Sequence, residues 1–310
     1  MAGDLLMRTL LSVVIVVYDM PRQALNTIRS FSAGYQRKVG TDDFEIIVVE
    51  NESERLLGAH AAQAVADNVR YFLQPNVGHS PVPALQFGVE QSRGDSIGLV
   101  VDGARMVTPR VLSLALAAFR ITPHAIVSVP GYHLGRTEQH RNPNHDERAE
   151  KALLEHIDWL TDGYRLFEAS VFFRGRHQHG FLLPLMESNC VFFSREAYAL
   201  IGGVDTRFDM PGGGMVNLDL YKRLVERPEA QLFVTPGEGT FHQFHGGVTT
   251  KVDDKREQML ADFRDQYLAI RGEPYTMPDT APRLLGPVPG WALPMLEFSA
   301  SCGVRALLPA

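Results

Sequence analysis

The regular alternation of short apolar runs with helix-length segments constrains the fold of this chain more than any other feature. The runs are rich in valine, isoleucine and leucine, and segments of mixed polarity separate them. This repetition is typical of parallel strands joined by right-handed crossovers, with helices covering both faces of the sheet. We therefore predict an α/β domain with a mostly parallel central sheet. The expected strands are 10–17, 44–49, 69–73, 96–101 and 125–130, and the expected helices lie near 21–33, 54–67, 79–92 and 109–120.

The pattern loosens after residue 130. Residues 131–146 are polar and contain His, Asn and Pro, so we expect a surface loop there. The tail from residue 273 is rich in proline and glycine and is expected to wrap the surface. Further helices are expected at about 147–160, 195–201 and 253–271, and further strands at 189–194 and 232–234.

Composition narrows the class of protein. A net charge of −6 argues against a nucleic-acid-binding protein, which needs an excess of Lys and Arg. The chain has two cysteines, Cys190 and Cys302, which favours a reducing compartment, so we expect a cytoplasmic protein. The apolar run at 10–17 is too short to cross a bilayer and is expected to be a buried strand, so no transmembrane segment is predicted. The sequence leaves open whether the chain forms a homo-oligomer.

Polar residues follow the ends of four predicted strands, where ligands of open α/β sheets bind. Asp102 directly follows the run from Ile97 to Val101, and a carboxylate there suits a metal or a phosphate. Tyr18 could stack on a nucleobase, or it could close the top of the core. Glu50 could accept hydrogen bonds from a base or a ribose, or it could cap the following helix. The other residues at these ends are Asn51, Ser53, Asn76, Gly78 and Gly103.

Two common nucleotide-binding motifs are absent from the sequence. A dinucleotide-binding fold would show GxGxxG after its first strand, where this chain has residues 18–21, YDMP. The phosphate-binding motif GxxxxGK[ST] does not occur anywhere. These absences argue against a Rossmann oxidoreductase and a P-loop nucleotidase.

The ordered strand ends resemble the nucleotide-binding half of family-2-like glycosyltransferases of the GT-A fold. Residues 12–19 (SVVIVVYD) are similar to the family's SVIIPTYN, 45–53 to its EIIVVDNGS, and 94–104 to its GDYIxFLDxD. Further on, 195–198 (REAY), 202–205 (GGVD) and Phe208 echo REAFxxxGGFDExF. The likeness covers about residues 10–225.

The resemblance implies an enzyme that moves a sugar from a nucleotide-diphosphate-sugar donor to a saccharide or other hydroxyl acceptor. It implies a GT-A-like catalytic domain over 1–250, with a nucleotide-binding half at about 8–130 and an acceptor half at about 131–250. Residues 251–310 would then form a C-terminal helix and tail on the acceptor side. The implied nucleotide-sugar site comprises Val17, Tyr18, Glu50, Asn51, Ser53, Asn76, Gly78, Asp102 and Gly103.

The family's metal-binding DxD is reduced here to Asp102-Gly103-Ala104, which leaves one carboxylate for a divalent cation. Mg²⁺ tolerates this because it commonly keeps several waters, whereas Mn²⁺ also accepts imidazole. Several GT-A enzymes complete the metal site with a C-terminal histidine. His242 resembles that ligand, with His245 as second choice, although histidines beside glycines are also common in ordinary loops.

This chain also departs from the family's pattern at the position of the general base. Aligning Asp219-Leu220 with the family's GEDxDL places Asn217 at the base position, and an amide cannot accept a proton at neutral pH. Either Asp219 or Glu187 takes over, or the reaction is retaining and the leaving phosphate deprotonates the acceptor. The resemblance favours inversion. Asp219 could instead be a helix N-terminal charge. Gly212, Gly213 and Gly214 could form a floor or lid of the acceptor site, or an ordinary loop.

Ala104 and Asn217 also support an alternative function. The chain would then be a catalytically degenerate protein that binds nucleotide sugars on the same fold without transferring them.

Overall fold

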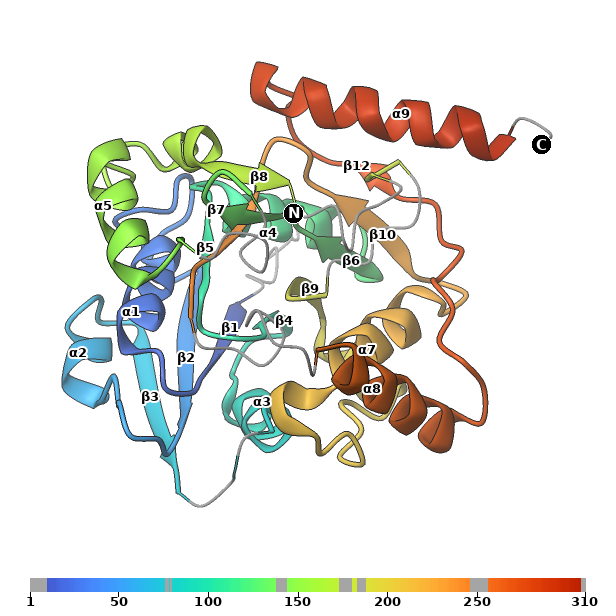
Figure 1. The fold of residues 1–310 in the computed structure, drawn as a ribbon, viewed down its shortest axis with the longest axis horizontal. Helices are drawn as coiled ribbons and strands as arrows, with labels where there is room; N and C mark the ends of the chain where they lie inside the picture. Colours follow the sequence, from blue (N-terminus) through green and yellow to red (C-terminus); the bar gives the residue numbers. More distant parts are fainter. Residues whose placement is uncertain are drawn as a thin grey trace, which may run out of the picture.

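The computed structural model describes residues 10–307, apart from 76–77, 79, 138–143, 173–179, 183–187 and 246–255. Eight of the described strands form one sheet in the order β12-β10-β6-β9-β4-β1-β2-β3, in which β9 runs antiparallel to both β4 and β6. The predicted α/β domain with a mostly parallel sheet is confirmed (Figure 1). The strands are β1 (Leu11–Val17), β2 (Phe44–Asn51), β3 (Val69–Gln74), β4 (Ser96–Val100), β6 (Ala125–Ser128), β9 (Cys190–Ser194), β10 (Gln231–Val234) and β12 (Arg283–Leu284).

Helices cover both faces of this sheet because the buried strands are apolar on both sides. Alternate residues of β1 face opposite ways. Val13 and Ile15 pack in the cluster that includes residues of α1, α2 and α4, whereas Val14 and Val16 pack with residues of α3, α6, α7 and α8. The helices are α1 (Pro21–Phe31), α2 (Ala59–Gln63), α3 (Val82–Gln91), α4 (Val111–Ile121), α6 (Arg195–Leu200), α7 (Val216–Val225) and α8 (Arg256–Arg271).

A second sheet of four described strands stands beside the first. Its order is β5 (Arg105–Val107), β11 (Thr240–His242), β7 (Gly131–Leu134) and β8 (Ser170–Phe172). One face is aromatic and packs into a core with Met106, Tyr132, Phe172 and Phe241. The opposite face carries the alternate residues of the same strands, among them the polar residues Arg105 of β5, His242 of β11 and His133 of β7. This polar face supplies part of the site described below.

The expectation of a surface loop over 131–146 is wrong for its first residues, which form the buried strand β7. That strand is held by pairing with β11, more than 100 residues later in the chain. The rest of the region leads into α5 (Glu147–Ile157), which begins at the predicted residue, with the Asp146 carboxylate accepting a hydrogen bond from the Ala149 N–H.

The C-terminal part adds two long helices. α8 lies beside α7, and α9 (Leu293–Leu307) runs along the outside of the molecule (Figure 1). Within the described residues, no helix has both the length and the apolar character needed to cross a membrane.

Candidate functional site

Asp102 lies two residues beyond β4, at the carboxyl edge of the main sheet. Its backbone adopts a left-handed conformation (φ 66°), which aspartate tolerates better than most residues and which turns the chain sharply toward β5. The Ala104 N–H donates a hydrogen bond to Oδ1 of the same carboxylate at 3.2 Å. The side chain keeps 29% of its surface exposed, so a ligand can reach it.

His242 and His245 meet Asp102 from the end of β11. The Asp102 Oδ2 atom lies 3.5 Å from His242 Nε2, and the Nε2 atoms of the two histidines are 2.9 Å apart. One ligand atom from each of the three residues lies within 4.8 Å of the other two. The structure thus brings together Asp102, His242 and the second-choice His245.

The surroundings favour an ionised carboxylate and neutral imidazoles. Burial is the largest single effect on Asp102 and opposes its ionisation, but Arg105, His242 and His245 together outweigh burial and hold the pKa of the carboxyl well below its usual value. Burial, assisted by Arg105, lowers the pKa of His242 to about 4, although Asp102 acts in the opposite direction. Burial also lowers the pKa of His245. These are the protonation states that metal ligation requires.

The three side chains fit a divalent cation. Two nitrogen ligands at right angles around an ion, each bonded at about 2.1 Å, would be about 3.0 Å apart. The His242–His245 separation of 2.9 Å matches that value. A set with two imidazoles and one carboxylate suits a transition metal better than Mg²⁺, which prefers oxygen ligands.

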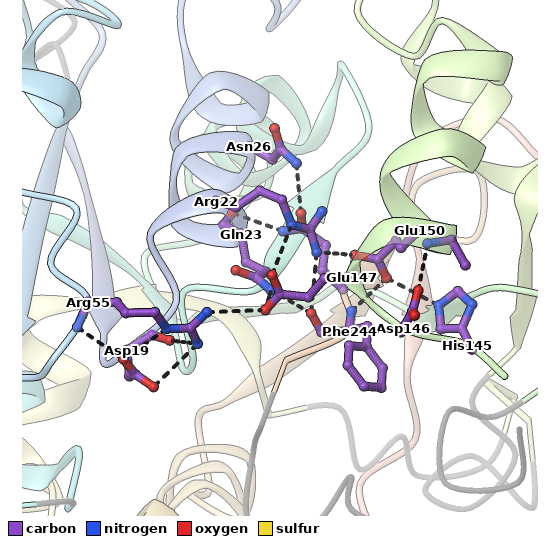
Figure 2. Close-up of polar contacts among 12 residues, drawn as sticks. Asp19, Arg22, Gln23, Asn26, Arg55, His145, Asp146, Glu147, Glu150 and Phe244 are labelled. Carbon is purple, nitrogen blue, oxygen red and sulfur yellow. Dashed lines mark hydrogen bonds and ion pairs between the residues drawn. The ribbon is translucent and has the colours of Figure 1, made fainter. Parts of the chain in front are cut away.

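The segment that carries both histidines is clamped through the residues between them (Figure 2). The Phe244 N–H donates to Glu150 Oε2 at 2.6 Å, and the Phe244 carbonyl accepts from Gln23 Nε2 at 2.6 Å. The Gln243 N–H donates to the Ala104 carbonyl at 2.8 Å, which ties the segment to the turn after Asp102. Residues of α1, α5 and the β4–β5 turn therefore set the position of His245.

Glu150 is the centre of this clamp. Its side chain is fully buried, accepts from Arg22 Nη2 at 2.8 Å through Oε1, and lies 3.4 Å from His145 Nε2 through Oε2. Glu147, one turn earlier on α5, forms ion pairs with Arg22 and Arg55 (Figure 2). These charged contacts dock α5 against α1 and against the loop after β2.

Several predicted nucleotide-binding residues have structural partners at the same edge. Both oxygens of the buried Glu50 carboxylate accept hydrogen bonds, from the Leu57 and Gly58 N–H groups and the Tyr71 hydroxyl. Asn51 donates to the Ser80 carbonyl at 3.2 Å, and Ser53 accepts from the Asp19 N–H. These contacts shape the loop after β2. Glu50 accepts N–H groups just before α2, but no side chain caps the first turn of that helix, so the predicted capping role is not observed. Tyr18 is half-buried beside them.

The other described residues of the predicted nucleotide-sugar site are a buried valine and two glycines, so their side chains offer few polar contacts to a ligand. Val17 is fully buried in β1. A Cβ at Gly103 would lie 3.0 Å from Val17 Cγ2, so the glycine lets the turn after Asp102 approach β1 closely. Gly78 is exposed with a positive φ. Asn76 and Glu187 lie outside the described residues.

Asn217 and Asp219 occupy different sides of α7, because helical residues two apart are rotated by about 200°. The Asn217 amide donates to Asn189 Oδ1 at 3.0 Å, and the Asn189 carbonyl accepts the N–H of Val101, next to Asp102. Asp219 is 1% exposed and points to Arg223 and Arg271. Asn217 is therefore directed toward the edge that carries Asp102, and Asp219 away from it.

Asp219 accepts hydrogen bonds from Arg223 Nε at 2.8 Å and from Arg271 Nε and Nη2 at 2.6 and 2.7 Å. These contacts favour a structural role, the joining of α7 to α8, over the predicted role of general base. Gly212 to Gly214 lie just before α7, all with positive φ, and a Cβ at Gly213 would lie 2.8 Å from Pro81.

Sequence reasoning missed two residues beside the candidate metal site of Asp102, His242 and His245, namely Arg105 and His133. They flank His242 on the polar face of the second sheet, where the register pairs His242 with Arg105 on β5 and with His133 on β7. The rings of His133 and His242 are 5.3 Å apart. The polar residue between Tyr132 and Leu134 was a signal of an alternating strand, but nothing in the sequence indicated its partner.

Comparison with known proteins identifies the relatives of this arrangement. A sequence model of the family described as Glycosyl transferase family 2 matches residues 12–200, more than half of the chain. The search of curated proteins found no match to this chain. The structure is similar to that of the mannosyltransferase PcManGT from Pyrobaculum calidifontis in complex with GDP-Man and Mn²⁺, with 14% identity and a TM-score of 0.52. The match covers 97% of this chain and 76% of that one, and it shows the GT-A-like fold.

Proposed function

The chain belongs to glycosyl transferase family 2, and we propose that it transfers a sugar from a nucleotide-diphosphate-sugar donor to a hydroxyl acceptor with the help of Mn²⁺. The observation that carries this proposal is the cluster of Asp102, His242 and His245 at the carboxyl edge of the sheet. Ligands of open α/β sheets bind at that edge, and the similar mannosyltransferase was solved with GDP-Man and Mn²⁺.

The roles of the residues follow from their chemistry. Asp102 would contribute the negative charge to the cation, and the neutral histidines would contribute two nitrogen ligands. When bound, the ion stabilises the charge that develops on the leaving diphosphate. Tyr18 and the loops shaped by Glu50 and Asn51 would border the nucleoside, whereas Asn217 and the glycines 212–214 would border the acceptor.

The identity of the base bears on the stereochemistry, because an inverting transfer needs a base to deprotonate the acceptor, whereas in a retaining transfer the leaving phosphate can do so. Asn217 cannot accept a proton, and both oxygens of Asp219 are held by arginines. We therefore propose Glu187 as the general base of an inverting reaction, the outcome that the family resemblance favours. Proton NMR of the fresh product reports the anomeric configuration, and Glu187→Gln should abolish transfer while leaving donor binding intact. A retained configuration would contradict this assignment.

The test of function is release of nucleoside diphosphate from UDP-glucose, GDP-mannose and dTDP-glucose, with and without Mn²⁺. We expect Mn²⁺-dependent release from at least one donor, and a loss of about 100-fold in Asp102→Asn and His242→Ala. His60→Ala, a change at an exposed residue of α2, is the matched control. Thermal unfolding of each variant checks that it is folded.

The alternative is a nucleotide-sugar-binding protein without transfer activity. It is supported by the amide at position 217 and by the single carboxylate of the cluster. Binding of a nucleotide sugar without any Mn²⁺-dependent release, with hydroxyl acceptors present, would establish it and end the proposal of an enzyme.

A further inference from the structure

Arg105 places a buried positive charge against the proposed metal ligands. It is the first residue of β5 and lies directly across from His242 of β11 in the sheet register. The residue is 4% exposed, and its Nε atom lies 3.6 Å from Asp102 Oδ1. Among the described residues, its Nε and Nη1 atoms have no hydrogen-bond partner.

Such a guanidinium is costly unless it binds something. A buried charged group that lacks hydrogen bonds keeps its desolvation penalty, and a contact at 3.6 Å recovers only part of it. The Asp102 carboxylate already accepts the Ala104 N–H through Oδ1 and lies near His242 through Oδ2. Within the described part of the chain, Arg105 therefore has donor atoms without hydrogen bonds next to Asp102, one of the proposed metal ligands.

The charges of the cluster lead to the same conclusion. One carboxylate, one guanidinium and two neutral imidazoles sum to zero, so a divalent cation alone would leave an excess of two positive charges in a mostly buried site. Like charges a few ångströms apart repel strongly there. A diphosphate supplies the missing negative charge, and a guanidinium fork matches phosphate oxygens.

We propose that Arg105 binds the diphosphate of the nucleotide donor, exchanging Asp102 for phosphate when the donor arrives. This inference rests on the proposed function, because it requires a nucleoside diphosphate as ligand. Arg105 then has two opposite effects: it supports diphosphate binding without metal, and it weakens metal binding without diphosphate. A residue with a purely structural role would not produce both.

The experiment measures the two affinities separately. UDP and GDP binding is measured by calorimetry in EDTA, and Mn²⁺ binding without nucleotide is measured by electron paramagnetic resonance. In Arg105→Met we expect nucleoside diphosphate affinity in EDTA to fall about tenfold or more, and Mn²⁺ affinity to rise severalfold. Arg105→Lys should retain part of the diphosphate affinity. Arg110→Met, beyond the other end of β5, is the matched control and should change neither value.

The possible results of this experiment distinguish a failure of the proposed role of Arg105 from a failure of the proposed function. If Arg105→Met leaves both affinities unchanged, or lowers both together with the melting temperature, the role of Arg105 is refuted and the proposed function stands. If the wild-type protein binds UDP or GDP only when Mn²⁺ is present, the role is also refuted, and this result needs no variant. If the wild-type protein binds no nucleoside diphosphate under either condition, the proposed function fails, and this inference fails with it.

Discussion

The substitution Asp219→Asn separates a structural role of this residue from a catalytic one. Asp219 lies in the first turn of α7, is 1% exposed, and accepts three hydrogen bonds from Arg223 and Arg271. Arg271 comes from α8 and also pairs with Asp205 at 3.0 Å. Asparagine keeps the size of the side chain but removes its charge and one acceptor oxygen.

The expected cost follows from these contacts. Removing one partner of a buried ion pair costs about 3–5 kcal/mol, because the opposite charge is left uncompensated. Asparagine retains one acceptor, and Arg271 retains Asp205, so we expect the lower end, about 3 kcal/mol. For a large domain at about 2 °C per kcal/mol, the melting temperature should fall by about 6 °C.

The assay combines thermal unfolding with nucleotide release at a temperature well below both transitions. Asp219→Asn should lose stability but retain most of its turnover there. Asp209→Asn, an exposed change in the loop before α7, should stay within about 0.5 kcal/mol of the wild type. An unchanged melting temperature with turnover reduced about 1000-fold would refute the structural assignment and return Asp219 to the role of base.

Three further substitutions test the clamp, a buried carboxylate and the core. Glu150→Gln should weaken Mn²⁺ binding about tenfold by loosening the histidine segment, whereas the exposed Glu155→Gln should not, as measured by electron paramagnetic resonance. Burial raises the pKa of Glu238 above its ordinary value of 4.5. The folded state therefore binds this proton more tightly than the unfolded state does, and the free energy of unfolding falls as the pH rises from 4.5 through the raised pKa. Glu238→Gln should flatten this fall in urea unfolding between pH 4 and pH 7. Gly98→Ala should destabilise by about 1–3 kcal/mol, because its Cβ would lie 2.5 Å from an aromatic ring of β9. Gly34→Ala, with open space around it, is the control for melting temperature.

The first half of the fold could be predicted from the sequence because its signals are local. Runs of β-branched residues formed strands, and amphipathic segments formed helices between them. The helix predicted near 54–67 is shorter, Ala59–Gln63, and the three-residue strand β5 was not predicted. The strand β7 was not predicted, since its alternating pattern covers only four residues and its partner β11 lies far along the chain. Pairing between distant strands depends on the whole fold.

The residues of the candidate site also differ in whether local sequence signals could predict them. Asp102 was visible because an apolar run ends just before it, and His242 because it resembles a family feature. Arg105 lies outside every strand and helix that the sequence predicted, and only the register of β5 shows that it lies across from His242. Glu50 and Asp219 illustrate the opposite case, because sequence order placed carboxylates near the site while packing turned both toward structural partners.

Ala104 stands where the DxD motif has its second carboxylate, and the packing around it does not suit a charged side chain. Its side chain is fully buried in the apolar cluster with residues of α1 and α4. Its N–H donates to Asp102 and its carbonyl accepts the Gln243 N–H, so the same residue aligns Asp102 with the segment that carries the two histidines of the proposed metal site. Restoring the motif with Ala104→Asp should bury an unpaired charge, destabilise the protein by several kcal/mol, and leave Mn²⁺ affinity no stronger. Tighter Mn²⁺ binding with an unchanged melting temperature would show instead that position 104 can still reach the ion. If Mn²⁺ affinity does not increase, the result supports the proposal that His245 supplies the ligand that the second aspartate of DxD would supply, and His245 lies 2.9 Å from His242.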